Sequence, residues 1–221
     1  MTDRLTLAVV TAGLSEDSTT TRLGEAIAKA ASGVVEHTGQ HVDIKVIQLR
    51  DLAHGLTDMM ITHVASPAVQ AAIDTVLNAD GLVAASPTYK ASYSGLFKQF
   101  FDVIDESALE NLPTVVAATG GSPRHSLVLD TAMRPLLSYL KALVLPLGIY
   151  AASEDWGHAD LQRRIDRVGA SLGTMLLAGS PGGASGSFND NDAARPGLRR
   201  EVKDEFSNVP DFASLLASVG S

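Results

Sequence analysis

A run of hydroxyl side chains follows the first apolar segment of this 221-residue chain. Residues 5–10 are continuously apolar, and the loop and helix start after them contain Ser15, Ser18, Thr19, Thr20, Thr21 and Arg22. A loop that leads into a helix N-terminus offers free backbone N–H groups and the positive end of the helix dipole, which favour an anion. One hydroxyl suffices to cap a helix, so four in succession favour a phosphomonoester site over capping alone. The loop fits neither G-x-x-x-x-G-K-[ST] nor G-x-G-x-x-G, so it is neither a Walker loop nor a Rossmann fingerprint.

A second loop, SPTYKASYSG from residue 86, is suited to the edge of a flat ring. Pro87 fixes one φ angle, so the backbone after it is rigid and can present N–H groups to such an edge. Tyr89 and Tyr93 are two of only four tyrosines in the chain, and Lys90 is the adjacent cation. Taken alone, the loop is equally well explained as a proline-containing strand exit that leads into the next helix.

A third loop, TGGSPRH from residue 119, carries paired glycines and two basic side chains. Gly120 and Gly121 lack a Cβ, so the backbone there can approach a ligand closely. Arg124 and His125 flank the next predicted helix start and are candidate phosphate contacts. A turn with a surface arginine explains this loop as well, so the case for a ligand depends on the three loops lying together.

Alternating strands and helices are predicted to position these loops. The predicted strands are 5–10, 42–46, 82–85, 114–118 and 147–151; the predicted helices are 22–32, 67–77, 95–104, 125–143 and 160–177, the fourth kinked or broken at Pro135. This alternation predicts a doubly wound parallel α/β sheet, and five strands fit the flavodoxin-like order 2-1-3-4-5. Ligands of such sheets bind outside the carboxyl ends of the strands where the strand order reverses, which would bring the three loops together.

Composition excludes several classes of protein. Asp and Glu total 25 against 17 Lys and Arg, so the net charge of -8 disfavours binding to nucleic acid or to an anionic membrane. Because cysteine is absent, disulfides, thiolate metal sites and a cysteine nucleophile are excluded. His37 and His41 are four residues apart but are separated by Gly39, so a surface turn is expected and no metal site.

The organisation of the chain is predicted from its ends and its low-complexity stretch. The N-terminal residues MTDRLTLAVVTAG are too short and charged too early for a signal peptide, and no window approaches the roughly 18 apolar residues of a membrane span. We therefore expect a cytoplasmic protein. Residues 1–178 are predicted to form one flavodoxin-like domain, and 179–221 a flexible insertion, rich in Gly, Ser, Asn and Asp, with a C-terminal arm.

Four segments match the pattern of a known family: SPTYKASYSGLFKQFFDVI, ATGG, HSLVLDTAMRPLLSYLKAL and VPDF. They resemble the NADPH-dependent FMN reductases of the flavodoxin-like superfamily, in particular the reductases that supply reduced flavin to two-component monooxygenases such as the alkanesulfonate system. The resemblance covers most of residues 4–178. It implies that NADPH delivers a hydride to FMN, so no catalytic acid or base is expected from the protein.

The resemblance also implies which residues hold the FMN. The phosphate would lie at Ser18, Thr19, Thr20 and Thr21, in the loop that also carries Ser15 and Arg22. Pro87, Thr88, Tyr89 and Lys90 would border the isoalloxazine. Thr119, Gly120 and Gly121, followed by Ser122, would lie at its pyrimidine end.

The resemblance further implies a homodimer or homotetramer, with the YKASYSG segment near a subunit contact, and a flavin-dependent monooxygenase as partner. Two alternatives stay open. One is a flavodoxin-like quinone or chromate reductase with bound FMN. The other is an FMN-binding electron-transfer protein, which Lys90 and Arg124 disfavour because flavodoxins are strongly acidic around the flavin.

Overall fold

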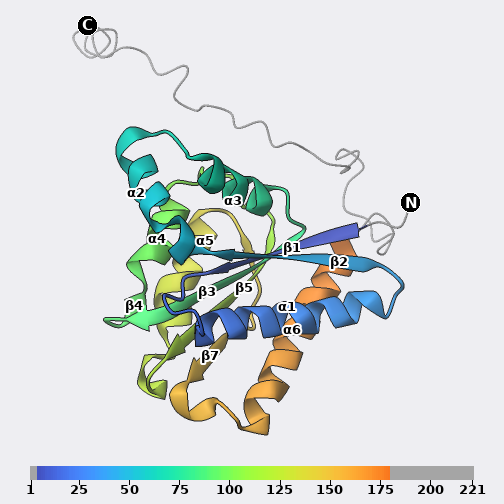
Figure 1. Ribbon diagram of the computed structural model, residues 1–221. Helices are drawn as coiled ribbons and strands as arrows, with labels where there is room; N and C mark the ends of the chain where they lie inside the picture. The colour runs from blue at the N-terminus through green and yellow to red at the C-terminus, as the bar shows by residue number, and fades with distance from the viewer. Residues whose placement is uncertain (1–3, 180–221) are drawn as a thin grey trace, which may run out of the picture.

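A parallel β-sheet forms the centre of the computed structural model, which describes residues 4–179 (Figure 1). Its five main strands lie in the order β2-β1-β3-β5-β7, and every pair among them is parallel. Their bounds are β1 Arg4–Thr11, β2 His41–Gln48, β3 Gly81–Tyr89, β5 Pro113–Gly120 and β7 Ile149–Ala152. Numbered as five strands, this is the order 2-1-3-4-5, so the predicted flavodoxin-like fold is confirmed.

Two short strands extend this sheet beyond the prediction. β4 (Ser92–Tyr93) pairs antiparallel with the end of β3, which makes a hairpin that protrudes from the carboxyl edge (Figure 1). β6 (Leu143–Val144) pairs with the start of β5, while β7 pairs with its end. The fifth position of the sheet is therefore shared by two segments.

Helices cover both faces of the sheet (Figure 1). α1 (Thr19–Glu36) and α6 (Ala159–Gly179) pack on one face, and the other is covered by α2 (Ala53–Thr62), α3 (Pro67–Leu77), α4 (Gly95–Asp102) and α5 (Arg134–Tyr139). Alternate residues of β1 enter different cores: Leu7 lies under α1 and α6, and Ala8 lies under α3 and α4. Because both neighbours are fully buried, the strand is continuously apolar, as the sequence indicated.

One helical prediction was wrong in extent, and one helix was not predicted. The single helix predicted over 125–143 is instead a 3₁₀ turn at Pro123–His125, a π-helical turn at Leu129–Met133 and then α5, which ends at Tyr139. Pro135 lies just after the π-helical turn, and the backbone at Met133 and Arg134 is helical. The predicted kink or break at Pro135 is therefore a π-helical distortion in the turn before it, and the helix is not interrupted. α2 and the 3₁₀ turn before it, Leu49–Leu52, were not predicted.

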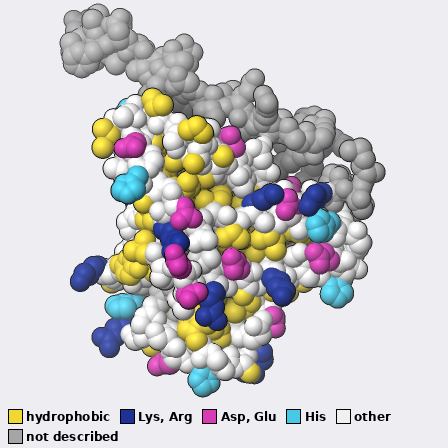
Figure 2. All heavy atoms as spheres, in the orientation of Figure 1, with side chains coloured by type: hydrophobic (Ala, Val, Ile, Leu, Met, Phe, Trp, Pro, Cys, Tyr) yellow, Lys and Arg dark blue, Asp and Glu magenta, His cyan; other side chains and the backbone are white. Residues whose placement is uncertain are grey.

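The visible surface carries apolar side chains over α2 and the start of α3 (Figure 2). Met60, Ile61 and Val64 are exposed by 45%, 73% and 69%. Over residues 4–179, no helix is both long and apolar enough to cross a bilayer. The predicted mobile segment and C-terminal arm lie outside the described residues, apart from Gly179, which ends α6.

Candidate functional site

Loops at the carboxyl ends of the central strands enclose a cleft of about 530 Å³. The start of α1 and the segments after β3 and β5 line it, so the three predicted loops do meet. The segment after β7 forms a fourth wall. The lining residues are Thr19, Arg22, Pro87, Thr88, Tyr89, Thr119, Gly120, Gly121, Ser153, Trp156 and Gly157.

The first turn of α1 is fixed by hydroxyls that bond within the chain. Ser18 is the N-cap, and its Oγ accepts from the backbone N–H of Thr21 at 3.2 Å. Thr20 Oγ1 lies 2.7 Å from the Oγ1 of Thr119 at the end of β5, and Thr21 Oγ1 lies 3.1 Å from that of Thr11. Three of the four consecutive hydroxyls therefore have partners in the protein.

This bonding leaves Thr19 and Arg22 as the members of the hydroxyl run and helix start that line the cleft. Both are exposed, whereas Ser18, Thr20 and Thr21 are buried. The helix itself does not use the first backbone N–H groups of α1, so they add positive potential at this end of the cleft. An anion can be held here by the helix start and the Arg22 guanidinium together.

Gly13 lets the loop after β1 lie against the helix cap. A Cβ at this position would come within 1.8 Å of the Oγ of Ser18, which is occupied in capping α1. Only a residue without a side chain permits this approach, so Gly13 sets how the loop enters the helix.

The segment after β3 presents a rigid backbone and a weakly bonded hydroxyl. Ser86 Oγ accepts from the N–H of Ser94, the N-cap of α4, at 2.9 Å and is 2.9 Å from the carbonyl of Pro87. Thr88 Oγ1 is buried and makes no hydrogen bond of good geometry among the described residues, although it lies near enough to the Tyr150 hydroxyl to oppose in part the rise that burial causes in the pKa of that phenol. Thr88 lines the cleft, so its hydroxyl is suited to form a better hydrogen bond with a ligand.

The segment after β5 is shaped by a tyrosine from β7. The Tyr150 hydroxyl donates to the carbonyl of Ser122 at 2.9 Å, and a Cβ on Gly120 would lie only 2.0 Å from that hydroxyl. Burial raises the pKa of Tyr150, so the phenol stays protonated and remains a donor at neutral pH. Gly121 has open space where a Cβ would be. The backbone of these glycines can therefore approach a flat ligand, as predicted.

The fourth wall, after β7, was not among the three predicted loops; of its residues, the sequence offered only Trp156, as a ring that either covers the flavin, packs in its loop or lies at a subunit contact. The centre of the Arg22 guanidinium lies 5.3 Å from the centroid of the Trp156 ring, so the wall contacts the start of α1. The same rule that selected the other loops, a position at the carboxyl end of a buried strand, would have selected Ser153, Trp156 and Gly157.

Eight predicted site residues do not line the cleft. Three of them, Ser18, Thr20 and Thr21, are the buried hydroxyls of the first turn of α1; the other five are Ser15, Lys90, Ser122, Arg124 and His125. Ser15 is exposed in the loop after β1, and Lys90 is exposed at the tip of the hairpin with a φ of 51°. Arg124 and His125 lie in the 3₁₀ turn beyond the glycines. The structure thus brings together eight of the sixteen predicted residues: Thr19, Arg22, Pro87, Thr88, Tyr89, Thr119, Gly120 and Gly121.

Comparisons with known proteins agree with this geometry. A family model described as NADPH-dependent FMN reductase matches residues 5–157. An FMN reductase (NADPH) of Pseudomonas aeruginosa is 41% identical over 143 residues, which cover 62% of this chain and 76% of that protein. The NADH-dependent FMN reductase SfnE of Pseudomonas putida is 38% identical over 155 residues, which cover 70% and 81%.

Solved structures show the same fold. An oxidoreductase from Corynebacterium diphtheriae aligns with a TM-score of 0.77 and 43% identity, over 80% of this chain and 98% of that one. The apo form of an NADH:FMN oxidoreductase, EMOB, aligns with a TM-score of 0.71 and 26% identity, over 80% and 92%.

Proposed function

Because the chain belongs to the NADPH-dependent FMN reductase family, we propose that its cleft binds FMN with the phosphate at the start of α1 and the ring between the segments after β3 and β5. The enzyme is an NAD(P)H-dependent FMN reductase, an oxidoreductase. Relatives named for NADPH and others named for NADH match it to similar extents. The proposal concerns the residues that hold the substrates and the fate of the reduced flavin.

The composition of the cleft carries the proposal. Its lining contains Arg22 and Tyr89 as ionisable side chains and no carboxylate, histidine or lysine. Such a site lacks the pairs of groups that general acid–base or metal chemistry needs. It suits a reaction whose reactive atoms belong to bound molecules: when present, NAD(P)H and FMN supply hydride transfer between their rings.

The residues of the chain would then bind and orient. The first turn of α1 and Arg22 would hold the phosphate by charge and by backbone N–H groups. The buried Thr88 hydroxyl, which has only an imperfect contact with the Tyr150 hydroxyl, would form a well-aligned hydrogen bond with the ligand. The backbone at Gly120 and Gly121, shaped by the Tyr150 hydroxyl, would face the polar edge of the ring, where N–H groups stabilise negative charge.

An anaerobic mixture of the protein, NADPH or NADH, and free FMN tests this function. We expect the absorbance of the reduced nicotinamide and of the oxidised flavin to fall together, in equal molar amounts. Oxidation that depends on added quinone and ignores added FMN would instead favour a quinone reductase. If the reduced nicotinamide were not oxidised with any flavin or quinone, both enzymatic functions would be overturned. The remaining candidate would then be a protein that binds FMN and exchanges electrons with a protein partner.

We further propose that reduced FMN leaves the cleft for a flavin-dependent monooxygenase and that the protein is a homo-oligomer. The open side of the cleft supports release, since Tyr89 at the cleft is exposed by 46%. Exposed apolar side chains support the homo-oligomer, since Leu127 and Tyr139 are each exposed by 65%. Release predicts that the protein binds reduced FMN more weakly than oxidised FMN, which anaerobic titration measures. Light scattering after gel filtration tests the assembly, and a monomer at micromolar concentration would contradict it.

A further inference from the structure

Trp156 stands on a short turn that forms the fourth wall of the cleft. The turn is a 3₁₀ segment, Ser153–Asp155, that follows β7 directly, and Trp156 is its C-cap. The ring is half-buried, lines the cleft and is the only tryptophan of the chain. The function of this ring is therefore sought in the contacts that it makes in the fold.

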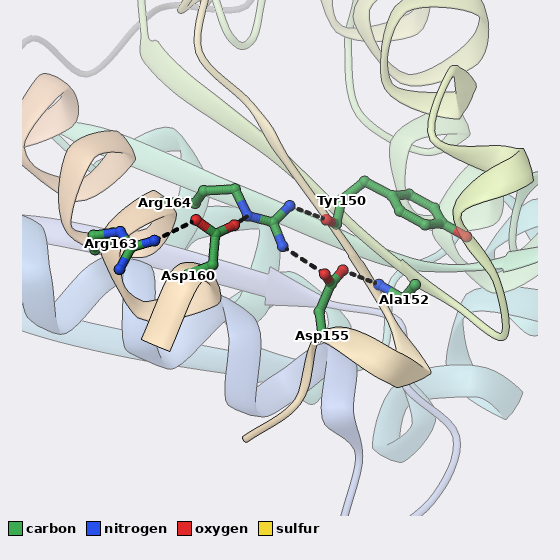
Figure 3. A network of polar contacts seen from close by, with 6 residues as sticks. All are labelled: Tyr150, Ala152, Asp155, Asp160, Arg163 and Arg164. Carbon is green, nitrogen blue, oxygen red and sulfur yellow. Dashed lines mark hydrogen bonds and ion pairs between the residues drawn. The ribbon is translucent and has the colours of Figure 1, made fainter. Parts of the chain in front are cut away.

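A network of polar contacts behind the turn holds this wall in place (Figure 3). Asp155 Oδ2 accepts from the N–H of Ala152 at 2.8 Å, and Asp155 Oδ1 pairs with Arg164 of α6 at 2.9 Å. Arg164 also donates to the carbonyl of Tyr150 at 3.0 Å and pairs with Asp160 at 3.3 Å. Both carboxylate oxygens of Asp155 are thus engaged, and the turn is anchored to a strand and to a helix. The backbone that carries Trp156 is therefore anchored, and the ring itself packs against the core under α1 and α6, so it forms a platform beside the cleft.

The Arg22 side chain, from the start of α1, lies over this platform. Its guanidinium is 5.3 Å from the ring centroid, which is cation–π distance, and within residues 4–179 it forms no ion pair with a carboxylate. The ring limits the conformations of a long side chain without neutralising its charge. An arginine held in this way keeps its N–H donors and its charge free for an anion at the start of α1.

We propose that Trp156 is a positioning residue that orients Arg22 toward the phosphate of the flavin, so that the site selects phosphorylated over unphosphorylated flavin. This inference rests on the proposed FMN binding and names a determinant of its specificity. The ring would act through Arg22 and not by stacking on the flavin. Loss of the ring should therefore weaken binding of FMN and leave binding of riboflavin, which has the same ring system without the phosphate, unchanged.

Calorimetric titration of each variant with FMN and with riboflavin tests the inference. For Trp156→Ala we expect FMN affinity to fall about 3- to 10-fold, in keeping with the strength of a cation–π contact, with no change for riboflavin. Trp156→Phe keeps an aromatic face and should restore most of the ratio of the two affinities. Ile61→Ala, which removes a large exposed apolar side chain that does not line the cleft, is the control and should leave the ratio unchanged.

A double-mutant cycle shows whether the effect passes through Arg22. In an Arg22→Gln background, Trp156→Ala should cause no further loss of FMN affinity. Asp155→Asn, which weakens the anchor without touching the ring, should lower the ratio in the same direction, and it serves as a second probe if Trp156→Ala folds poorly.

Two results would overturn the inference. Equal losses for FMN and riboflavin in Trp156→Ala would show that the ring contacts the flavin directly, and an unchanged ratio would show that it does not position Arg22. Either result can occur in a protein whose wild type reduces FMN, so the proposed function would stand. A wild type that binds neither flavin would refute the proposed function itself.

Discussion

Substitution of Gly120 by alanine tests whether the Tyr150 hydroxyl shapes the segment after β5. The new Cβ would lie 2.0 Å from that hydroxyl and 3.1 Å from the Cζ of the ring, whereas non-bonded heavy atoms settle at roughly 3.5–4.0 Å. The hydroxyl must move away, and its 2.9 Å hydrogen bond to the Ser122 carbonyl is lost.

The magnitude follows from three contributions. Overpacking costs about 1–3 kcal/mol, and the lost hydrogen bond costs about 1 kcal/mol. Because φ of Gly120 is not left-handed, replacing this glycine by alanine also stabilises the protein by about 0.4–1 kcal/mol, since the unfolded chain then has less conformational entropy. The free energy of unfolding of Gly120→Ala should therefore fall by about 1.5–3 kcal/mol. In a domain of this size, that is about 3–12 °C in Tm.

The double variant Gly120→Ala/Tyr150→Phe separates this cause from a general loss of packing. Removing the hydroxyl leaves the ring carbon at 3.1 Å as the nearest atom, which a small shift accommodates. The double variant should thus be more stable than the sum of the single effects predicts, by about 1–2 kcal/mol. Urea unfolding without flavin measures all four proteins, and Gly121→Ala, whose Cβ meets nothing within 4 Å, is the control. Strict additivity, or a Gly120→Ala no less stable than Gly121→Ala, would refute the reasoning.

Other predictions concern pH, helix packing and the hairpin. Because burial raises the pKa of Tyr150 above 10.0, the folded protein keeps a proton that the unfolded chain loses, and this contribution to stability is lost as pH rises above about 10. The stability difference between wild type and Tyr150→Phe should therefore narrow between about pH 9 and pH 11 in urea titrations, and a constant difference would contradict the assignment. Gly173→Ala places a Cβ 2.7 Å from the Ala31 carbonyl oxygen of α1, so it should destabilise the protein by about 1–3 kcal/mol. Gly33→Ala meets nothing within 4 Å and should stabilise the protein by up to about 1 kcal/mol. Thermal unfolding of both variants tests this pair of expectations, and equal effects would rule out close packing of α1 against α6. Ala91, at a φ of 65° in the two-residue turn between β3 and β4, suits glycine, so Ala91→Gly should stabilise by about 0.5–1 kcal/mol in the same assay unless the turn has another conformation.

Local signals in the sequence predicted where several helices begin. The predicted helices 67–77 and 95–104 each follow a serine, Ser66 and Ser94, and in both cases the serine Oγ accepts from the backbone N–H three residues on. These signals depend on neighbours in the chain, so a single sequence contains them. Pro135 did signal a kink or break in the predicted helix 125–143, but no local signal indicated that the turn before it, Leu129–Met133, is π-helical.

For the candidate site, too, local sequence signals predicted some features, and contacts between distant segments decided the others. Residue types at the ends of buried strands indicated Thr88, Gly120 and Arg22, because a parallel sheet brings its carboxyl ends to one edge. The sequence did not indicate that Thr20 would bond to Thr119, 99 positions away, or that Trp156 would face Arg22. The hydroxyl run was interpreted as a phosphate cradle, and in the fold most of it fixes the first turn of α1.

The sequence by itself determined the doubly wound sheet, the edge at which the cleft forms and the class of reaction, since these follow from the order of apolar segments and from a family pattern. Only the tertiary structure decided which side chains remain available to a ligand. That outcome depends on contacts between segments distant in sequence, such as the Tyr150 hydroxyl against Gly120 and the Asp155–Arg164 pair behind Trp156. Such contacts are set by strand pairing and helix packing, so no local pattern records them.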